Sequence, residues 1–533
     1  MTIERSLRVE FDEQRIDRLF ERFNQSQLPG AAVGIALSGK PLYRKAFGLA
    51  SMELPVTLSP QMRMRIGSVS KHFTALAFML LCEEGRATLD APLGQHLPDL
   101  HPVARQVTAR HLMGHLSGLR DAHDLAFQFS GTGRSVSSAE LLSFYQTLDD
   151  VNAAPGAQWN YSNGGYLLLT ALIERISGCS LEDFLRERIF EPAGMWNTLL
   201  RRQDTDFVPN SATLHMTRLG GGFERSYMGL AFAGEGGIVS TIDDLLRWCA
   251  QMDHPWIGTA ATWSAMTVPQ QLVGQQSTGY GFGLIRGRYR GTETLFHPGG
   301  GMGGNAQMLK VPAAHLDVVV IVNRHDAWAS ELANSILDAC LTDLEPLLAV
   351  ADQSCATGVF RSPSSRRVIQ LGEDHGQQIV TIDGFDWPYV READGVLRPV
   401  PIWRFVNQEV HLIGERHRPE AIRFVDCGQA DDLARDETGP DANFEELVGL
   451  YRSDTTGTEV TLARTAGGAN RCQSRGRFGS VEYRMEPVCR GVWRARPTGA
   501  LPWLGGWLLF DPQHRGFEFT SLRTWALPFR REH

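Results

Sequence analysis

Hydrophobic and polar positions give roughly the first 345 residues the pattern of a mixed α+β unit. Residues 31–37 and 41–48 read as a pair of strands that begins a sheet. Apolar side chains recur at helical spacing across residues 70–84, and Gly85 follows as a C-cap. Further helices are expected at residues 166–176, 181–188, 243–251 and 328–341, and a returning strand pair at residues 308–311 and 316–323.

The rest of the chain has a different texture, with short β-type runs, frequent Gly and Pro, and almost no helical periodicity. The segment Gly-Val-Phe-Arg-Ser at residues 358–362 returns as Gly-Leu-Tyr-Arg-Ser at residues 449–453. A polar, acidic stretch at residues 428–446 reads as a linker. We therefore expect an α+β domain over residues 1–345 and two small antiparallel β-barrels over residues 346–435 and 436–533.

Composition and charge exclude several classes of function. A net charge of −8 and a pI near 6.1 argue against a nucleic-acid surface. The N-terminal residues mix charges without an apolar core, and no run of about 18 apolar residues indicates a membrane partner. Eight scattered cysteines without a Cys-x-x-Cys pair, among them Cys82, Cys179 and Cys249, are expected to be reduced core residues. These features favour a cytoplasmic location, although a mature exported form would have the same composition.

Ser68 and Lys71 open the long predicted helix with the spacing Ser-x-x-Lys. At i and i+3 the Ser68 hydroxyl and the Lys71 amine share one helix face. A serine needs a base to take its proton, and lysine can act as one when burial lowers its pKa, whereas arginine stays protonated. Lysine occurs only four times among the 52 Lys and Arg residues, so Lys71 indicates a requirement for a titratable amine. Taken alone, the motif is more typical of an exposed helix start with a solvated lysine.

Two further clusters change that interpretation. The segment Tyr-Ser-Asn at residues 161–163 is predicted to lie on a loop, where a tyrosine can relay a proton and an asparagine amide can hold a carbonyl. His297 ends an apolar run and leads into Gly299, Gly300 and Gly301. Glycines allow the close backbone approach that an oxyanion hole requires, although a simple glycine-rich hairpin has the same pattern.

The order and spacing of these three clusters resemble the serine β-lactamase and penicillin-binding-protein family, most closely its class C and D-aminopeptidase branch. Residues 112–119, 236–241 and 279–284 look similar as well. The resemblance covers the first 345 residues and implies a β-lactamase/transpeptidase-like catalytic domain. The β-type tail is similar to that of D-aminopeptidase, in which two lipocalin-like eight-stranded barrels follow the catalytic domain.

The resemblance implies a role for each matching residue. Ser68 would attack the scissile carbonyl and form an acyl-enzyme, while Lys71 and Tyr161 would share the acid and base work. Asn163 would hold the carbonyl on the acyl side of the substrate. The backbone amides of Ser68 and Gly300 would form the oxyanion hole, with Gly299 beside them, and water would then release the acid.

His297 stands where many β-lactamases and D,D-peptidases have a lysine, and in the resemblance it would orient Tyr161 or the substrate. A neutral imidazole attracts a carboxylate much less than a permanent cation does. The expected activity is therefore that of a D-stereospecific serine aminopeptidase or amidase that releases N-terminal D-residues such as D-Ala. The alternatives are an esterase or D,D-carboxypeptidase of the same fold and, from a different class, a catalytically silent binding protein.

In D-aminopeptidase a loop of the third domain enters the active site and contributes an acid. The comparable stretch here, residues 496–507, holds no Asp or Glu. We expect an apolar specificity loop containing Ala500 and Trp503, with Trp503 and Trp507 able to stack on a substrate side chain. Binding of an α-ammonium would then fall to acids of the first domain. The alternative is that this loop points to solvent and the barrels only stabilise a dimer.

Other ligands are not indicated. His111 and His115 have the i, i+4 spacing of a zinc pair, but no Glu follows His111, so a structural role is expected and no metal site is predicted. No Walker motif or dinucleotide fingerprint is present, so no cofactor is expected. The expected partners are a small peptide or amide substrate, β-lactams as slowly released inhibitors, and a second copy of the chain, since the family implies a homodimer.

Overall fold

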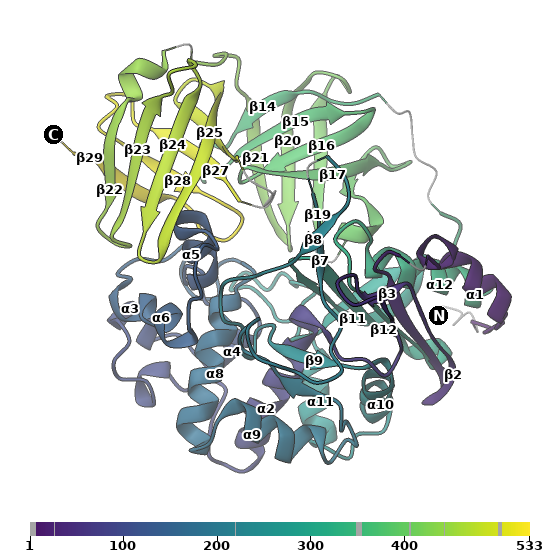
Figure 1. Ribbon diagram of the computed structural model, residues 1–533. Helices are drawn as coiled ribbons and strands as arrows, with labels where there is room; N and C mark the ends of the chain where they lie inside the picture. The colour runs from purple at the N-terminus through teal and green to yellow at the C-terminus, as the bar shows by residue number, and fades with distance from the viewer. Residues whose placement is uncertain are drawn as a thin grey trace.

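The computed structural model describes residues 7–25, 27–218, 220–347, 354–404, 407–441, 443–498 and 504–532. An α+β body carries two β-barrels, which stand next to each other on one side of it (Figure 1). The fold class expected from the sequence, an α+β domain followed by two antiparallel barrels, is thereby confirmed. In the described ranges no helix is both long and apolar enough to cross a membrane.

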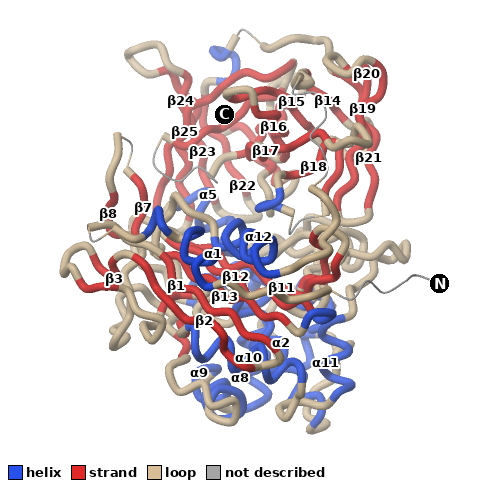
Figure 2. Tube along the Cα trace, turned by 90° about the vertical axis from the view of Figure 1, so that its right-hand side faces the viewer, coloured by secondary structure: helices blue, strands red, loops and turns tan. Residues whose placement is uncertain are grey.

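The body is organised around a 6-stranded antiparallel sheet in the order β10-β11-β12-β13-β1-β2. Its strands are β10 (Ile285–Tyr289), β11 (Thr292–Gly301), β12 (Gly304–Val311), β13 (Leu316–Val322), β1 (Ala31–Leu37) and β2 (Lys40–Phe47). One face is covered by α1 (Glu13–Leu19) and α12 (Ala329–Cys340), and α10 (Ile242–Asp253) packs on the other (Figure 2). Both predicted strand pairs and the predicted closing helix are confirmed.

A helical lobe beside the sheet surrounds α2 (Lys71–Glu83), which the chain enters through the short 3-10 helix η2 (Gly67–Ser70). Residues 71–81 are buried without exception, including the polar residues Lys71, His72 and Thr74. A helix buried on every side has to be enclosed by other elements, here α8 (Asn163–Ser177), α9 (Leu181–Leu185) and α11 (Ala260–Thr267). The predicted long helix is confirmed, and Gly85 follows it in the left-handed conformation with φ of +70°.

Other elements of the body are short. They are α3 (Pro102–Arg105), α4 (Ala109–Met113), α5 (Ala122–Ser130), α6 (Ser138–Leu142), α7 (Phe144–Thr147), β3 (Leu49–Ser51), β4 (Val56–Thr57), β5 (Met64–Arg65), β6 (Leu199–Leu200), β7 (His215–Thr217), β8 (Phe223–Arg225) and β9 (Ile238–Ser240).

Both modules beyond the body are closed antiparallel barrels. The first comprises β14 (Gly358–Arg361), β15 (Val368–Asp374), β16 (Gln377–Ile382), β17 (Phe385–Arg391), β18 (Leu397–Pro399), β19 (Gln408–Gly414), β20 (Pro419–Asp426) and β21 (Gln429–Arg435). The second comprises β22 (Gly449–Ser453), β23 (Thr458–Arg464), β24 (Asn470–Gly476), β25 (Gly479–Cys489), β26 (Val492–Pro497), β27 (Gly506–Phe510), β28 (Gly516–Thr520) and β29 (Leu527–Arg531). The repeated five-residue segments form the first strand of each barrel, with Phe360 and Tyr451 buried at equivalent places.

The expectation of a linker over residues 428–446 is partly wrong. Gln429–Arg435 is β21, which closes the first barrel by pairing with β14. Leu433 is the one buried residue of this strand, and on the outer surface Asp432 pairs with Arg423 of β20. A barrel strand with a solvated outer face therefore has the composition of a linker.

The second barrel is fastened to the body through α5, which lies beneath it in Figure 1. The ring of Phe129 lies among the inward-facing residues of the barrel, 5.0 Å from Phe519 and 5.7 Å from Phe529 between centroids. Tyr483 donates a hydrogen bond of 2.6 Å to the carbonyl of Gln128. The space left beside these rings is about 10 Å³, room for a single water at most, so this barrel is a packed core.

The two barrels contact each other through a residue that the sequence assigned to substrate binding. Trp507 lies on β27, is buried, and donates its indole N–H to the carbonyl of Val368 in the first barrel at 3.1 Å. The expectation that Trp507 stacks on a substrate is therefore wrong. The two barrels also share the ion pair between Arg494 and Asp386, at 2.9 Å.

The predicted burial of the cysteines holds for Cys249 and fails for Cys179. Cys179 is exposed because it follows Gly178, which ends α8 in the left-handed conformation and turns the chain toward α9. Cys82 is half-buried on α2. Seven of the eight cysteines are free thiols, namely Cys82, Cys179, Cys249, Cys340, Cys427, Cys472 and Cys489.

Removing the ring that joins α5 to the second barrel should destabilise the protein. Phe129 is 3% exposed, so Phe129→Ala leaves a cavity in the packed barrel and should cost about 3–5 kcal/mol. We expect a lower thermal unfolding midpoint by differential scanning fluorimetry. Phe207 is fully exposed, and Phe207→Ala is the matched control that should unfold at the wild-type temperature. Equal midpoints for the two variants would show that Phe129 does not hold the barrel.

Candidate active site

Ser68 lies on η2 and Lys71 is the first residue of α2. At the junction of these two helices their side chains face each other. The Lys71 Nζ is 3.0 Å from Ser68 Oγ, 2.8 Å from Asn163 Oδ1 and 2.6 Å from the carbonyl oxygen of Glu235. A neutral amine has two N–H donors and one lone pair. The two carbonyl-type oxygens can take the donors, and the lone pair then faces the Ser68 hydroxyl. This geometry suits a base that accepts the serine proton.

Burial strongly disfavours the protonated form of Lys71. Its side chain is inaccessible to solvent, and burial lowers the pKa of Lys71 well below its usual value, with the Arg523 guanidinium lowering it further. The carboxylates of Glu235 and Asp121 oppose this shift by attraction, without reversing it. The rings of Tyr161 and Tyr166 lie 4.8 and 5.4 Å from the amine.

Asn163 is the first residue of α8 rather than part of the expected loop, because Ser162 caps that helix by accepting from Gly165 N. Its backbone N–H donates to Asp121 Oδ2 at 2.8 Å, and Gly164 N–H donates to Asp121 Oδ1 at 3.2 Å. Asp121 also caps α5. One buried carboxylate thus joins the starts of two helices and fixes the Asn163 side chain beside Lys71.

Tyr161 reaches Ser68 from the other side and lies within a group of rings. Burial raises the pKa of Tyr161, and a hydrogen bond with Ser68 and the charge of Arg523 oppose this shift without reversing it. His115 packs on its ring at 4.2 Å between centroids, and Arg523 Cζ lies 5.2 Å from the ring centroid. Tyr161 is therefore a protonated phenol held beside the nucleophile, able to pass a proton rather than to store a charge.

His297 is buried, and both of its ring nitrogens are occupied. Nδ1 lies 2.6 Å from the carbonyl oxygen of Pro298, which can only accept, so Nδ1 carries the proton and Nε2 accepts from Tyr280 OH at 2.9 Å. Burial, and next the charge of Lys71, lower the pKa of His297 well below its usual value. The imidazole is thus neutral, as expected, but it holds Tyr280 and contacts Tyr161 only by ring packing at 6.4 Å.

Two glycines of β11 border the nucleophile in different ways. A Cβ on Gly299 would lie 1.8 Å from the carbonyl oxygen of Ile66, so the strand passes η2 backbone against backbone. Gly67 meets the same strand, because its own Cβ would lie 2.8 Å from Gly300 N. Gly300 is exposed and faces open space. This close approach brings the N–H of Gly300 near that of Ser68, as an oxyanion hole requires.

The second barrel reaches this site through a loop that the sequence reasoning did not identify. The loop between β28 and β29, residues 521–526, places Arg523 Nη1 3.4 Å from Asp121 Oδ2 and its guanidinium against Tyr161. The loop expected from the resemblance, residues 496–507, includes Ala500 and Trp503, which lie outside the described residues. Within its described part, Gly505 N–H donates to Gln128 Oε1 at 2.8 Å.

Several residues of the site carry no local signal in the sequence. Asp121, Glu235 and Arg523 belong to no motif, and Tyr280 lay in a stretch noted only for its similarity. His111 and His115 are separate in function: His111 closes a capping box at α4, whereas His115 Nδ1 accepts from Ser162 N–H at 3.1 Å. Within the described ranges no cluster of His, Cys, Asp or Glu has the arrangement of a metal site.

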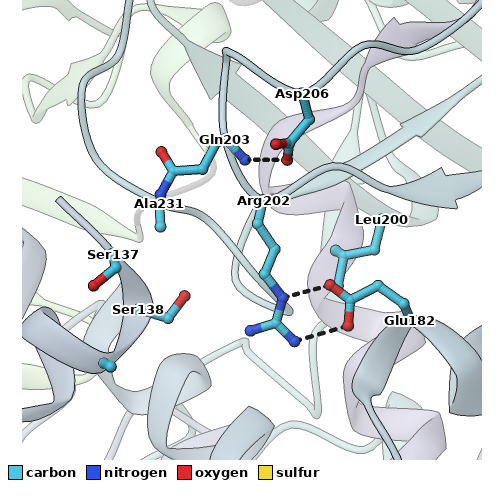
Figure 3. A pocket seen from close by; sticks show the side chains of 9 residues that line it. Ser137, Ser138, Glu182, Leu200, Arg202, Gln203, Asp206 and Ala231 are labelled. Carbon is cyan, nitrogen blue, oxygen red and sulfur yellow. Dashed lines mark hydrogen bonds and ion pairs between the residues drawn. The ribbon is translucent and has the colours of Figure 1, made fainter. Parts of the chain in front are cut away.

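A separate pocket of about 420 Å³ lies away from these residues (Figure 3). Arg202 crosses it and is neutralised by Glu182, with 2.8 Å between Nη2 and Oε2. None of the side chains that line it belongs to the group around Ser68.

Comparison with known proteins gives a consistent result for the body of the chain. The profile of the Beta-lactamase family matches residues 16–341. This range includes the Ser68, Tyr161 and His297 clusters and ends where the barrels' part of the chain begins.

Similarity to curated proteins extends over the barrels as well. The chain is 25% identical over 512 residues to the D-aminopeptidase of Brucella canis, covering 95% of this chain and 91% of that protein. It is 27% identical over 513 residues to the D-aminopeptidase of Gluconobacter oxydans, covering 95% and 92%.

Solved structures show the same fold at lower identity. The octameric penicillin-binding protein homologue from Pyrococcus abyssi superposes with a TM-score of 0.58 at 21% identity, covering 79% of this chain and 100% of that one. The D-amino acid amidase from Ochrobactrum anthropi SV3 in complex with D-phenylalanine gives 0.53 at 24% identity, covering 61% and 98%.

Replacing Lys71 by arginine should separate positive charge from the ability to lose a proton. We expect Lys71→Arg to lower kcat by at least ~10³, because arginine cannot take the proton of Ser68. Lys45→Arg is the matched control, since Lys45 pairs with Glu13 and Asp17 at a partly exposed site, and it should retain wild-type activity. In the wild type, kcat/KM should fall as pH drops through the lowered pKa of Lys71. Lys71→Arg activity within tenfold of wild type would exclude lysine as the base.

The two glycines of β11 should differ sharply in their tolerance of a methyl group. Gly299→Ala drives a Cβ into the Ile66 carbonyl and should displace the backbone at Ser68, with a loss of about 10² or more in kcat. Gly300→Ala keeps its N–H and meets no atom within 4 Å, so kcat should stay within about tenfold of wild type. Steady-state kinetics on folded variants compares them, and equal losses would contradict the backbone packing described.

Proposed function

The chain belongs to the Beta-lactamase family, and from this premise we propose that it is a serine hydrolase that cleaves amide bonds through an acyl-enzyme. Ser68 is the nucleophile, Lys71 its base, and Tyr161 the group that returns the proton to the leaving amine. The observation that carries the proposal is the buried Lys71 amine, which lies 3.0 Å from Ser68 Oγ and has no carboxylate partner at its nitrogen among the described residues.

Each step of the reaction has a candidate group at the required place. Lys71 accepts the Ser68 proton as Ser68 Oγ attacks the carbonyl carbon, and the backbone N–H groups of Ser68 and Gly300 stabilise the oxyanion. Tyr161 and Lys71 then deliver a proton to the leaving nitrogen as the C–N bond breaks. A water molecule attacks the ester by the reverse sequence, which frees Ser68 and releases the acid.

We assign the substrate class as peptides or amides of D-amino acids, as in D-aminopeptidases. The similarity to curated D-aminopeptidases along 95% of the chain supports this assignment, because it includes the barrels. The neutral His297 supports it too, since it offers no cation to a carboxylate on the side of the substrate that it faces.

The acids that the body places near the site are buried. Asp121, Asp124 and Glu235 each accept hydrogen bonds from protein groups, and Glu235 Oε2 has no hydrogen-bond partner among the described residues. Binding of a free α-ammonium by acids of the first domain stays a prediction. Selection of the D-isomer then depends on how the substrate side chain fits beside Ser68.

The finer assignments of partner and location are part of the same proposal. Free thiols at seven of the eight cysteines support a reducing compartment and hence the cytoplasm. A homodimer is proposed from the resemblance of the chain to D-aminopeptidases, and sedimentation analysis measures it directly.

Paired chromogenic substrates test the proposed function. We expect D-alanine p-nitroanilide to be hydrolysed with a kcat/KM at least ~10² above that of the L-isomer, and Ser68→Ala to remove this activity. Intact-mass spectrometry after ampicillin treatment should show an adduct on Ser68 that is lost slowly. Hydrolysis of p-nitrophenyl esters without any anilide turnover would instead indicate an esterase, and rapid ampicillin turnover would indicate a β-lactamase.

A further inference from the structure

The loop at residues 521–526 is held rigidly against the body of the protein. Ser521 and Thr524 both donate their hydroxyl protons to Asp124 Oδ2 at 2.7 Å. Asn152 donates to the carbonyl of Arg523 at 2.7 Å and accepts from Trp525 N–H at 2.9 Å. The backbone is therefore fixed on both sides of Arg523, and the position of that side chain is set by the body rather than by the barrel alone.

The side chain of Arg523 lies between Asp121 and Tyr161. One nitrogen is 3.4 Å from the fully buried Asp121 carboxylate, and the guanidinium carbon lies over the ring of Tyr161, 5.2 Å from its centroid. The Arg523 side chain is 32% exposed. A guanidinium has five N–H donors, so the edge that does not face Asp121 remains able to bind an anion in a forked geometry.

The positive charge of Arg523 is not cancelled by Asp121 alone. Besides Arg523, that carboxylate accepts from the backbone N–H groups of Asn163, Gly164 and His123, which share its charge. The other basic groups around Tyr161 are neutral or buried: burial lowers the pKa values of Lys71, His115 and His297 well below their usual values. Among the described residues that contact Tyr161, Arg523 is therefore the one whose positive charge is available to a bound substrate.

We infer that Arg523 is a subsite for a carboxylate carried by the leaving group of the substrate. This inference rests on the proposed function, in which Tyr161 protonates the leaving nitrogen. In a dipeptide with a free C-terminus the carboxylate carbon lies two bonds from that nitrogen, so it comes near Tyr161 and the guanidinium next to it. The enzyme should then prefer D-aminoacyl amino acids, whose leaving group is an amino acid, over D-aminoacyl amides.

Two substrates that differ only in this charge test the inference. D-alanyl-glycine has the carboxylate and D-alanyl-glycinamide has a neutral amide in its place. The measured quantity is the ratio of their kcat/KM values, which cancels any general loss of activity. We expect the ratio in wild type to exceed that in Arg523→Gln by about tenfold, as a partly exposed charge-assisted pair provides.

Matched variants keep the result interpretable. Arg530→Gln removes the same charge from an exposed position on the same barrel and should keep the wild-type ratio. Arg523→Lys keeps the charge without the forked donors and should give an intermediate ratio, and it serves as the test if Arg523→Gln does not fold. Circular dichroism and thermal unfolding verify the fold of each variant.

The outcomes separate the inference from the function on which it rests. Equal ratios in wild type and folded Arg523→Gln, with both substrates slowed alike, would show that Arg523 only positions Tyr161 and would overturn the inference. In that case D-alanine p-nitroanilide is still hydrolysed and the proposed function stands. If neither dipeptide nor anilide is hydrolysed and Ser68 forms no ampicillin adduct, both the function and the inference fail.

Discussion

A lysine gives up its proton near neutral pH only where the protein makes its charged form costly, and this requirement governs much of the fold around Ser68. The Lys71 amine lies at the start of a helix that is buried on all sides, and two carbonyl-type oxygens rather than a carboxylate accept its hydrogen bonds. The helix can be buried in this way because α8, α9 and α11 enclose it. The exclusion of water that lowers the pKa of Lys71 is thus a property of the whole helical lobe.

The nearby acids are arranged so that they do not undo this effect. Asp121 and Glu235 would each stabilise a protonated Lys71, and both are within range to do so. Asp121 instead accepts hydrogen bonds from backbone N–H groups at the starts of α5 and α8. Glu235 Oε1 contacts Ala233 N–H and His123 Nε2. Arg523 adds an opposing positive charge next to Asp121. The state of the base therefore depends on a balance of charges, one of which comes from the second barrel.

The sequence predicted the parts of the site that follow one another locally and missed the parts that only folding brings together. Lys71 could be predicted as the base from two features, its spacing from Ser68 and the rarity of lysine. The spacing is informative because helix geometry fixes the relative position of the two side chains. The glycines at 299–301 indicate close backbone contact, but only the structure separates Gly299, which has no room for a side chain, from Gly300, which has.

Arg523 and Asp121 are about four hundred positions apart and belong to no motif, so nothing in the chain relates them. The resemblance led to residues 496–507, whose described parts, 496–498 and 504–507, belong to the same barrel as the loop that the structure describes at the site. The strand β21 was not predicted because its solvated outer face gives the segment a polar composition.

The barrel and the body are bound together at the same residues that shape the site, so they form one catalytic unit. Asp124, buried with its pKa raised by burial, has its hydrogen bonds satisfied by Ser521 and Thr524. Without the barrel loop this carboxylate would lose both hydroxyl donors, and Asp121, three residues earlier, would lose Arg523. Asp121 caps α5, Asp124 lies on it, and Phe129 of the same helix inserts into the barrel, so the barrel packs on the helix that Asp121 joins to Asn163. The position of the Asn163 amide beside Lys71 is therefore coupled to the packing of a domain that begins nearly three hundred residues later in the chain.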